Sequence, residues 1–129
     1  MNANERRLKM NEISELIIGC AYRVHNELGA GFLEKVCENA LAYELRKNGR
    51  EVRQQHPISV YYDQVIMGEY LADLLVEGVV IVELKAVKEL DEVHLAQCLN
   101  YLKASNLSLC LLLNFAKPKL QIKRVIHNF

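Results

Sequence analysis

The spacing of apolar residues changes character along the chain, and this limits the folds open to it. Up to Gly49 apolar residues recur every three or four positions, as on one face of a helix, in two segments separated by Gly29-Ala30-Gly31. Asn48-Gly49 is a typical left-handed helix end, and residues 52–85 are then rich in strand formers. Helical spacing returns over 89–103, before two short apolar strands expected at 107–115 and 119–126. The sequence therefore predicts an α/β fold with a central mixed β-sheet flanked by helices, in the order helix, helix, three strands, helix, two strands.

Length and composition indicate a single domain. The chain has 129 residues, of which 51% are hydrophobic, enough for one compact core. We expect one domain over 1–129, with residues 1–11 disordered or loosely ordered. Sixteen basic and sixteen acidic residues cancel, so any nucleic-acid binding must come from a local patch. There is no apolar leader or membrane-length segment, and four cysteines without CxxC spacing are expected as buried reduced thiols, so we expect a cytoplasmic protein.

Charged residues interrupt an otherwise apolar hairpin predicted from strands 66–76 and 79–85. Asp73 lies within Leu71-Ala72-Asp73-Leu74-Leu75-Val76, and Glu83 and Lys85 end the run that starts at Val79. Val79 to Val82 is apolar on both faces, as in a central strand, whereas Pro57 favours an edge for the strand at 52–62. Because burying a lone carboxylate is costly, Asp73 and Glu83 imply either an ion pair with Lys85 or a bound cation.

The connection between these strands decides whether Asp73 and Glu83 share a face. A two-residue loop at Glu77-Gly78 would put them on opposite faces, because strand side chains alternate. We therefore predict a three-residue connection, 76–78 with Gly78 left-handed, or an equivalent bulge. This register would pair Asp73 with Ile81 and set it diagonal to Glu83.

Three helical residues join this pattern. Glu34 lies on the second predicted helix, and Gln97 and Tyr101 lie one turn apart on the third. Taken together, the segments 31–34, 73–77, 80–87, 94–97 and 100–104 occur in an order and at separations that resemble the signatures of the bacterial GxxExxY proteins. The resemblance runs from about residue 13 to residue 125.

The GxxExxY proteins are assigned to the PD-(D/E)XK nuclease superfamily, and this resemblance implies a restriction-endonuclease-like fold and specific roles. Asp73, Glu83, the backbone carbonyl of Leu84 and the helical Glu34 would hold Mg²⁺ or Mn²⁺, and Lys85 would position or activate the attacking water. Gln97 and Tyr101 would match the Q-x-x-x-Y helix beside the metal and the nucleic-acid backbone. One position departs from the pattern, because Cys37 stands where the family has its eponymous tyrosine.

Other polar residues have weaker claims to a role. His94 precedes Gln97 by three residues and faces either the site or solvent. The basic residues Lys117, Lys119, Lys123 and Arg124 form either a solvated strand face or a phosphate contact. Glu38, Glu44, Arg46 and Lys47 are expected on the exposed side of the second helix.

Two functions remain open from the sequence. The first is a metal-dependent nuclease that hydrolyses phosphodiester bonds of DNA or RNA, favoured by the complete set of Asp73, Glu83 and Lys85. The second is a catalytically weak or silent accessory protein with a nuclease fold, favoured by the zero net charge. Both imply nucleic acid as a partner, bound weakly by this domain alone.

Overall fold

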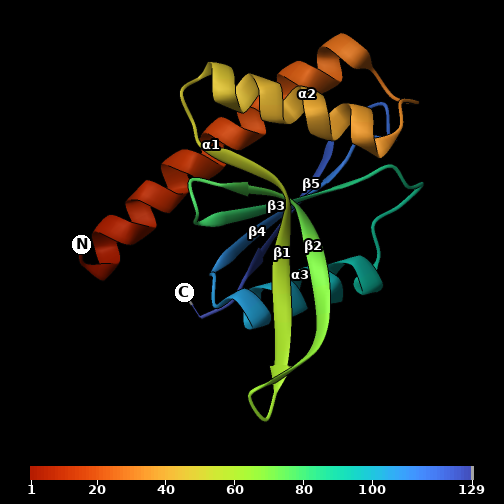
Figure 1. Cartoon of the computed structure of the whole chain (residues 1–129). Helices are drawn as coiled ribbons and strands as arrows, with labels where there is room; N and C mark the ends of the chain where they lie inside the picture. Colours follow the sequence, from red (N-terminus) through yellow and green to blue (C-terminus); the bar gives the residue numbers. More distant parts are fainter. Residues whose placement is uncertain (129) are drawn as a thin grey trace.

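A computed structural model describes residues 1–128 and has the predicted order of elements (Figure 1). The helices are α1 (Ala3–Leu28), α2 (Glu34–Lys47) and α3 (Glu92–Ser105). The strands are β1 (Val52–Tyr62), β2 (Val65–Val76), β3 (Val80–Lys85), β4 (Leu109–Asn114) and β5 (Gln121–Ile126). The α/β class and the α-α-β-β-β-α-β-β order are confirmed.

All five strands form one mixed sheet in the order β1-β2-β3-β4-β5. Only the β3–β4 pair is parallel, and α3 makes the crossover between these two strands. The apolar strand β3 is central and β1, which carries Pro57, lies at an edge, as the sequence predicted. Asp63 and Gln64 turn the chain between β1 and β2 with positive φ at both residues.

The helices cover both faces of the sheet, and each face has its own core. Helices α1 and α2 lie on one side and α3 on the other (Figure 1). Leu74, Val82 and Leu84 pack toward α1 and α2, whereas Leu75 and Ile81 pack toward α3. Because strand side chains alternate, Glu83 belongs to the α3 face, like Ile81. The four cysteines are buried in these cores, and none of them forms a disulfide.

The N-terminal helix starts earlier than the sequence suggested. Residues 1–11 were expected to be loosely ordered, but α1 begins at Ala3 because Asn2 caps it, its side chain accepting the Glu5 N–H at 2.8 Å. Most of this first stretch is exposed, so it lacked the apolar spacing that predicted the rest of the helix. No helix within residues 1–128 is both long and apolar enough to span a membrane.

The β2–β3 connection has the predicted length but a different register. Val76 pairs with Val80, so the three connecting residues are 77–79 rather than 76–78. Gly78 is left-handed with φ of 68°, as predicted, but Glu77 is left-handed as well, with φ of 54°. Glu77 leaves the β2–β3 ladder because its backbone N–H bonds to the Glu51 carbonyl at 2.8 Å, and its carboxylate accepts the Glu51 N–H. Continuing this register sets position 73 opposite position 83, on the same face, instead of pairing Asp73 with Ile81.

The sheet forks immediately beyond this hairpin. β2 pairs with β3 only through residues 74–76 and 80–82, whereas the rest of β2 pairs with β1 alone. Figure 1 shows the β1–β2 hairpin extending away from the other strands past α3. Asp73 and Glu83 are the first residues past the last paired positions, so they lie at the fork.

Candidate active site at the fork of the sheet

At the fork, carboxylate side chains take the place of backbone partners. The Leu84 N–H donates to Asp73 Oδ2 at 2.9 Å, and the Asp73 N–H donates to Glu83 Oε2 at 3.2 Å. On each strand a carboxylate thus accepts a hydrogen bond from a backbone N–H of the other strand. These N–H groups would otherwise have no partner, because the ladder ends here. The two carboxyl groups are thereby held against each other, on the face of the sheet that α3 covers.

Burial makes this pair electrostatically unusual. The Glu83 side chain is 4% exposed, and burial, followed by hydrogen bonding to Asp73 and the charge of Asp73, raises the pKa of Glu83 to about 10. Glu83 therefore carries a proton at neutral pH and shares a hydrogen bond with Asp73. A proton on Glu83 relieves the repulsion between the two carboxylates, as a bound cation also would.

The backbone of Leu84 faces the same fork. The Lys85 carbonyl accepts the Phe115 N–H at 2.9 Å and so points toward β4. Successive residues of an extended strand direct their backbone groups to opposite edges, so the N–H and the carbonyl of Leu84 both point toward β2. The Leu84 N–H bond to Asp73 agrees with this direction. Two carboxylates and one carbonyl, all hard oxygen donors, thus converge on the fork.

Lys85 is half-buried and shares the strand face of Glu83. The simplest alternative from the sequence was that its ammonium neutralises Glu83 in an ion pair. In the described part of the chain, no ion pair joins Lys85 to Glu83 or Asp73. Lys85 therefore lies on the same strand face as Glu83, two residues further along β3, without forming an ion pair with it.

The third helix brings two more predicted residues over this face. Tyr101 is buried, and burial, together with the nearby Glu83 and Asp73, raises the pKa of its phenol to about 12. Gln97 lies one turn earlier on α3 and is half-buried. The Tyr101 ring also contacts the ring of Tyr70 on β2, with centroids 5.7 Å apart. Tyr101 thus links the carboxyl pair to the β1–β2 hairpin.

Comparison with known proteins agrees with this geometry. The profile of the PD-(D/E)XK nuclease superfamily matches residues 11–125, which is nearly the whole chain and includes every element from α2 to β4. The chain belongs to the PD-(D/E)XK nuclease superfamily. No curated protein and no solved structure matches the chain.

Two acidic residues of α2 are candidates for the helical acid that the resemblance implies. Glu34, the predicted one, is exposed at the start of the helix, and among the described residues it makes no hydrogen bond to Asp73 or Glu83. Glu38, one turn later, was expected to be exposed but is 3% exposed. It is connected to the site, because the Gln55 amide donates to Glu38 Oε1 at 2.8 Å and to Asp73 Oδ1 at 3.3 Å. The exposed-face prediction for Glu38 was therefore wrong.

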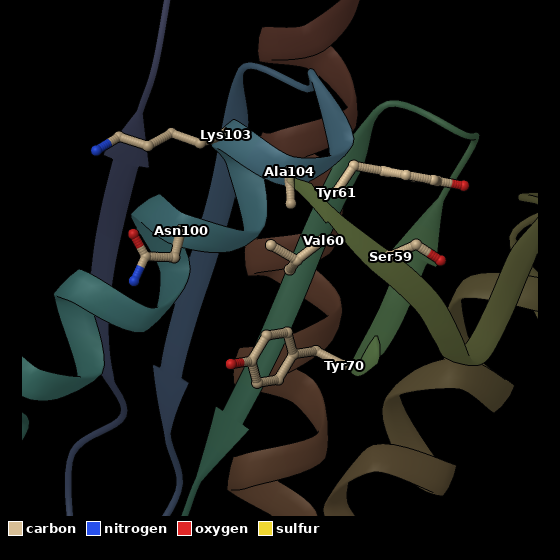
Figure 2. Close-up of a pocket in the computed structure, with 7 residues that line it drawn as sticks. All are labelled: Ser59, Val60, Tyr61, Tyr70, Asn100, Lys103 and Ala104. Atoms are coloured by element: carbon tan, nitrogen blue, oxygen red, sulfur yellow. The ribbon is translucent and has the colours of Figure 1, made fainter. Parts of the chain in front are cut away.

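A groove lies between the β1–β2 hairpin and α3 (Figure 2). It has a volume of about 490 Å³, and in Figure 2 Val60 and Tyr70 point from the hairpin toward the helix that carries Asn100. Lys103 extends from the same helix, and the exposed Tyr61 points away from Asn100. The groove does not include the carboxyl pair, but Tyr70 connects the two through its contact with Tyr101.

The remaining candidates lie apart from the carboxyl pair. His94 Nδ1 accepts the Asp91 N–H at 3.1 Å in a capping box that starts α3, which is why this helix begins at Glu92 and not at the predicted residue 89. Cys37, which stands where the GxxExxY pattern has its tyrosine, is buried in the core between the sheet and helices α1 and α2. Lys117 pairs with Glu89, while Lys119, Lys123 and Arg124 are exposed. Within residues 1–128, no three His, Cys, Asp or Glu side chains are grouped to hold a metal ion.

Proposed function

We propose that this protein is a metal-dependent nuclease that hydrolyses phosphodiester bonds of DNA or RNA at the Asp73–Glu83 fork. One observation carries the proposal: two carboxyl groups, one of them deeply buried, are held together by hydrogen bonds from each other's strand, and burial beside Asp73 raises the pKa of Glu83 to about 10. The Leu84 carbonyl points to the same place. This donor set fits Mg²⁺ or Mn²⁺, which prefer oxygen ligands and tolerate a site with few protein ligands because they keep several waters.

The residues around the fork then have separable roles. Asp73, Glu83 and the Leu84 carbonyl would hold the cation, and Glu83 would release its proton in doing so. A divalent cation supplies polarisation of a phosphodiester oxygen and activation of water at neutral pH. Lys85, free of an ion pair with Glu83, would orient the attacking water and stabilise the negative charge that develops on the phosphate. Gln97 and Tyr101 would contact the nucleic-acid backbone from α3.

The groove beside the fork supports a nucleic-acid substrate. Tyr70 presents a half-exposed ring, and Lys103 on the facing helix is among the residues that line the groove, with its ammonium directed away from Tyr70 in Figure 2. Bases stack on aromatic faces without sequence preference, and cations follow the phosphate backbone. We infer that a strand lying in this groove passes Tyr70 and then reaches the carboxyl pair by way of Tyr101.

A second candidate is a catalytically weak or silent accessory protein with the same fold. The zero net charge and the absence of a third carboxyl side chain around the pair, within the residues that the structure describes, favour it.

We also place the chain among the GxxExxY proteins, on the motifs that surround Glu34, Asp73 and Glu83. We further propose that the protein is cytoplasmic, where the unpaired thiols would remain reduced.

Direct assay of cleavage separates the two functions. Purified protein is incubated with single-stranded, duplex and branched DNA and with RNA, in Mn²⁺ or in EDTA. We expect cleavage of at least one substrate in Mn²⁺, none in EDTA, and none by Asp73→Asn. If the wild type cleaves no substrate while it still binds nucleic acid, the accessory role is the correct one.

A binding measurement tests the groove. Tyr70→Ala is expected to weaken binding of single-stranded DNA or RNA by roughly tenfold, the scale of one lost base-stacking contact. The matched control is Tyr43→Ala, which removes a tyrosine of α2 that is more exposed than Tyr70 and lies away from the groove. Fluorescence anisotropy with a labelled oligonucleotide gives both dissociation constants. Equal effects of the two changes would exclude the groove as the binding surface.

A further inference from the structure

Gln55 on β1 joins two carboxylates that lie on different elements. Its side-chain nitrogen Nε2 is 2.8 Å from Glu38 Oε1 on α2 and 3.3 Å from Asp73 Oδ1 on β2. An amide nitrogen has two hydrogens, so these bonds use both of them. The opposite amide orientation would set the Gln55 oxygen against two carboxylates, so the neighbours fix which way the amide points.

The backbone at Gln55 is unusual for a strand residue. Its φ is 53°, in the left-handed region that side chains with a Cβ rarely adopt. The β1–β2 ladder pairs Gln54 with Leu74 and His56 with Ala72, but it is interrupted between them, at Gln55 and Asp73. Strained residues persist only where the surroundings hold them, and they concentrate at functional sites. The strain therefore falls at the one β1 residue that reaches Asp73.

Glu38 is a fixed anchor for this bridge. Its other oxygen, Oε2, accepts from Gln54 Nε2 at 2.7 Å and from Lys35 Nζ at 3.1 Å. Three donors therefore hold a carboxylate that is almost completely buried. Gln54 bonds to Glu38 but makes no bond to Asp73, which distinguishes it from its neighbour.

We propose that Gln55, anchored by Glu38, is a positioning residue that orients Asp73 to receive a divalent cation. This inference rests on the proposed function. Gln55 holds Asp73 Oδ1 and the Leu84 N–H holds Asp73 Oδ2, so the carboxylate cannot rotate away from the fork. Partners that orient a ligating carboxylate typically contribute 10- to 100-fold to metal affinity. The helical acid of this chain thus acts through Gln55, at a distance from the carboxyl pair.

Two variants of Gln55 separate positioning from folding. Gln55→Gly removes the amide and also relieves the left-handed strain, which offsets part of the cost of leaving Glu38 Oε1 without its donor, so the metal-free protein should stay folded with a modest change in melting temperature. Gln55→Met keeps the length of the side chain without a donor. For both, the dissociation constant for Mn²⁺, measured by electron paramagnetic resonance, should increase by roughly 10- to 100-fold. The matched control is Gln54→Ala, whose Mn²⁺ affinity should stay near that of the wild type.

The outcomes distinguish this inference from the proposed function. Wild-type protein that binds no Mn²⁺ would overturn the metal site itself, and the role of Gln55 with it. Wild-type binding with unchanged affinity in Gln55→Gly would overturn the positioning role alone. An equal loss of affinity in Gln54→Ala would also overturn it, because the effect would then come from the surroundings of Glu38. A stable Gln55→Gly protein with weakened Mn²⁺ binding supports it, since a purely structural residue would not give that combination.

Discussion

Removing Lys85 is expected to leave metal binding intact and to lower cleavage by about two or more orders of magnitude, the scale of losing an electrostatic or acid–base group. Wild-type protein should gain about 2.7 kcal/mol of stability at a hundredfold excess of Mn²⁺ over its dissociation constant, because only the folded chain assembles the site. In Lys85→Ala this gain should persist or grow, since a neighbouring positive charge is gone. In Asp73→Asn it should vanish. Thermal melts with and without Mn²⁺, run beside the cleavage assay, measure both quantities.

A second lysine variant serves as the control for Lys85→Ala. Lys88→Ala removes an exposed lysine three residues later in the chain and should change neither the melting temperature shift nor cleavage. If Lys85 served only to neutralise Glu83, its loss would mainly destabilise the metal-free protein. A wild-type melting temperature that is indifferent to millimolar Mn²⁺ and Mg²⁺ would decide against the metal site.

Much of the fold follows from local patterns in the sequence. The change from helical to strand spacing after Gly49 predicted α2, β1 and the boundary between them. The structure confirms this boundary, because Gly49 has the left-handed φ of 78° that is typical of a helix end. The run from Val79 to Val82 predicted a central strand because only such a strand is buried on both faces. Where prediction failed, at residues 3–11, exposed helix formers gave no periodicity, and a single capping residue decided the start.

The candidate site was harder to predict because its details depend on contacts between distant segments. Asp73 and Glu83 stood out as charges in apolar strands, but their direct opposition depends on the connection at 77–79, where Glu77 bonds to Glu51 and the residue opposite position 73 becomes 83 instead of 81. No local pattern indicates that bond. Gln55 gave no signal either, because a left-handed residue within a strand is set by its tertiary partners.

Glu38 did give a signal in the sequence. Leu41, Ala42 and Leu45 follow it at three, four and seven positions, and this is the spacing of one helix face. All three are buried, and Glu38 lies on the same stripe. An acidic residue on an apolar stripe is a stronger sign of a site than one at an exposed helix start, because its burial needs partners.

The pair of carboxyl groups also makes a strong prediction about pH. Glu83 has its pKa raised from 4.5 to about 10, so between these values the folded protein holds a proton that the unfolded chain has released. Stability from this proton is complete below about pH 4.5 and is lost as the pH rises toward 10. One such proton changes the free energy of unfolding by about 1.4 kcal/mol per pH unit, so the metal-free melting temperature should fall by roughly 10 °C between about pH 6 and pH 8.

Glu83→Gln isolates this effect, because the amide resembles the protonated acid in shape and can still accept the Asp73 N–H. The variant should show a flatter pH profile than the wild type and melt higher at pH 8, whereas Glu69→Gln, an exposed carboxylate on β2, should behave as the wild type. Since a divalent cation would replace the Glu83 proton, the Mn²⁺-dependent rise in the wild-type melting temperature should grow with pH and be absent from Glu83→Gln. Wild-type and Glu83→Gln proteins with parallel pH profiles would mean that Glu83 does not hold the proton. A pH effect without any response to Mn²⁺ would describe a structural acid pair, so the two measurements together separate a site built for a cation from one that only resembles it.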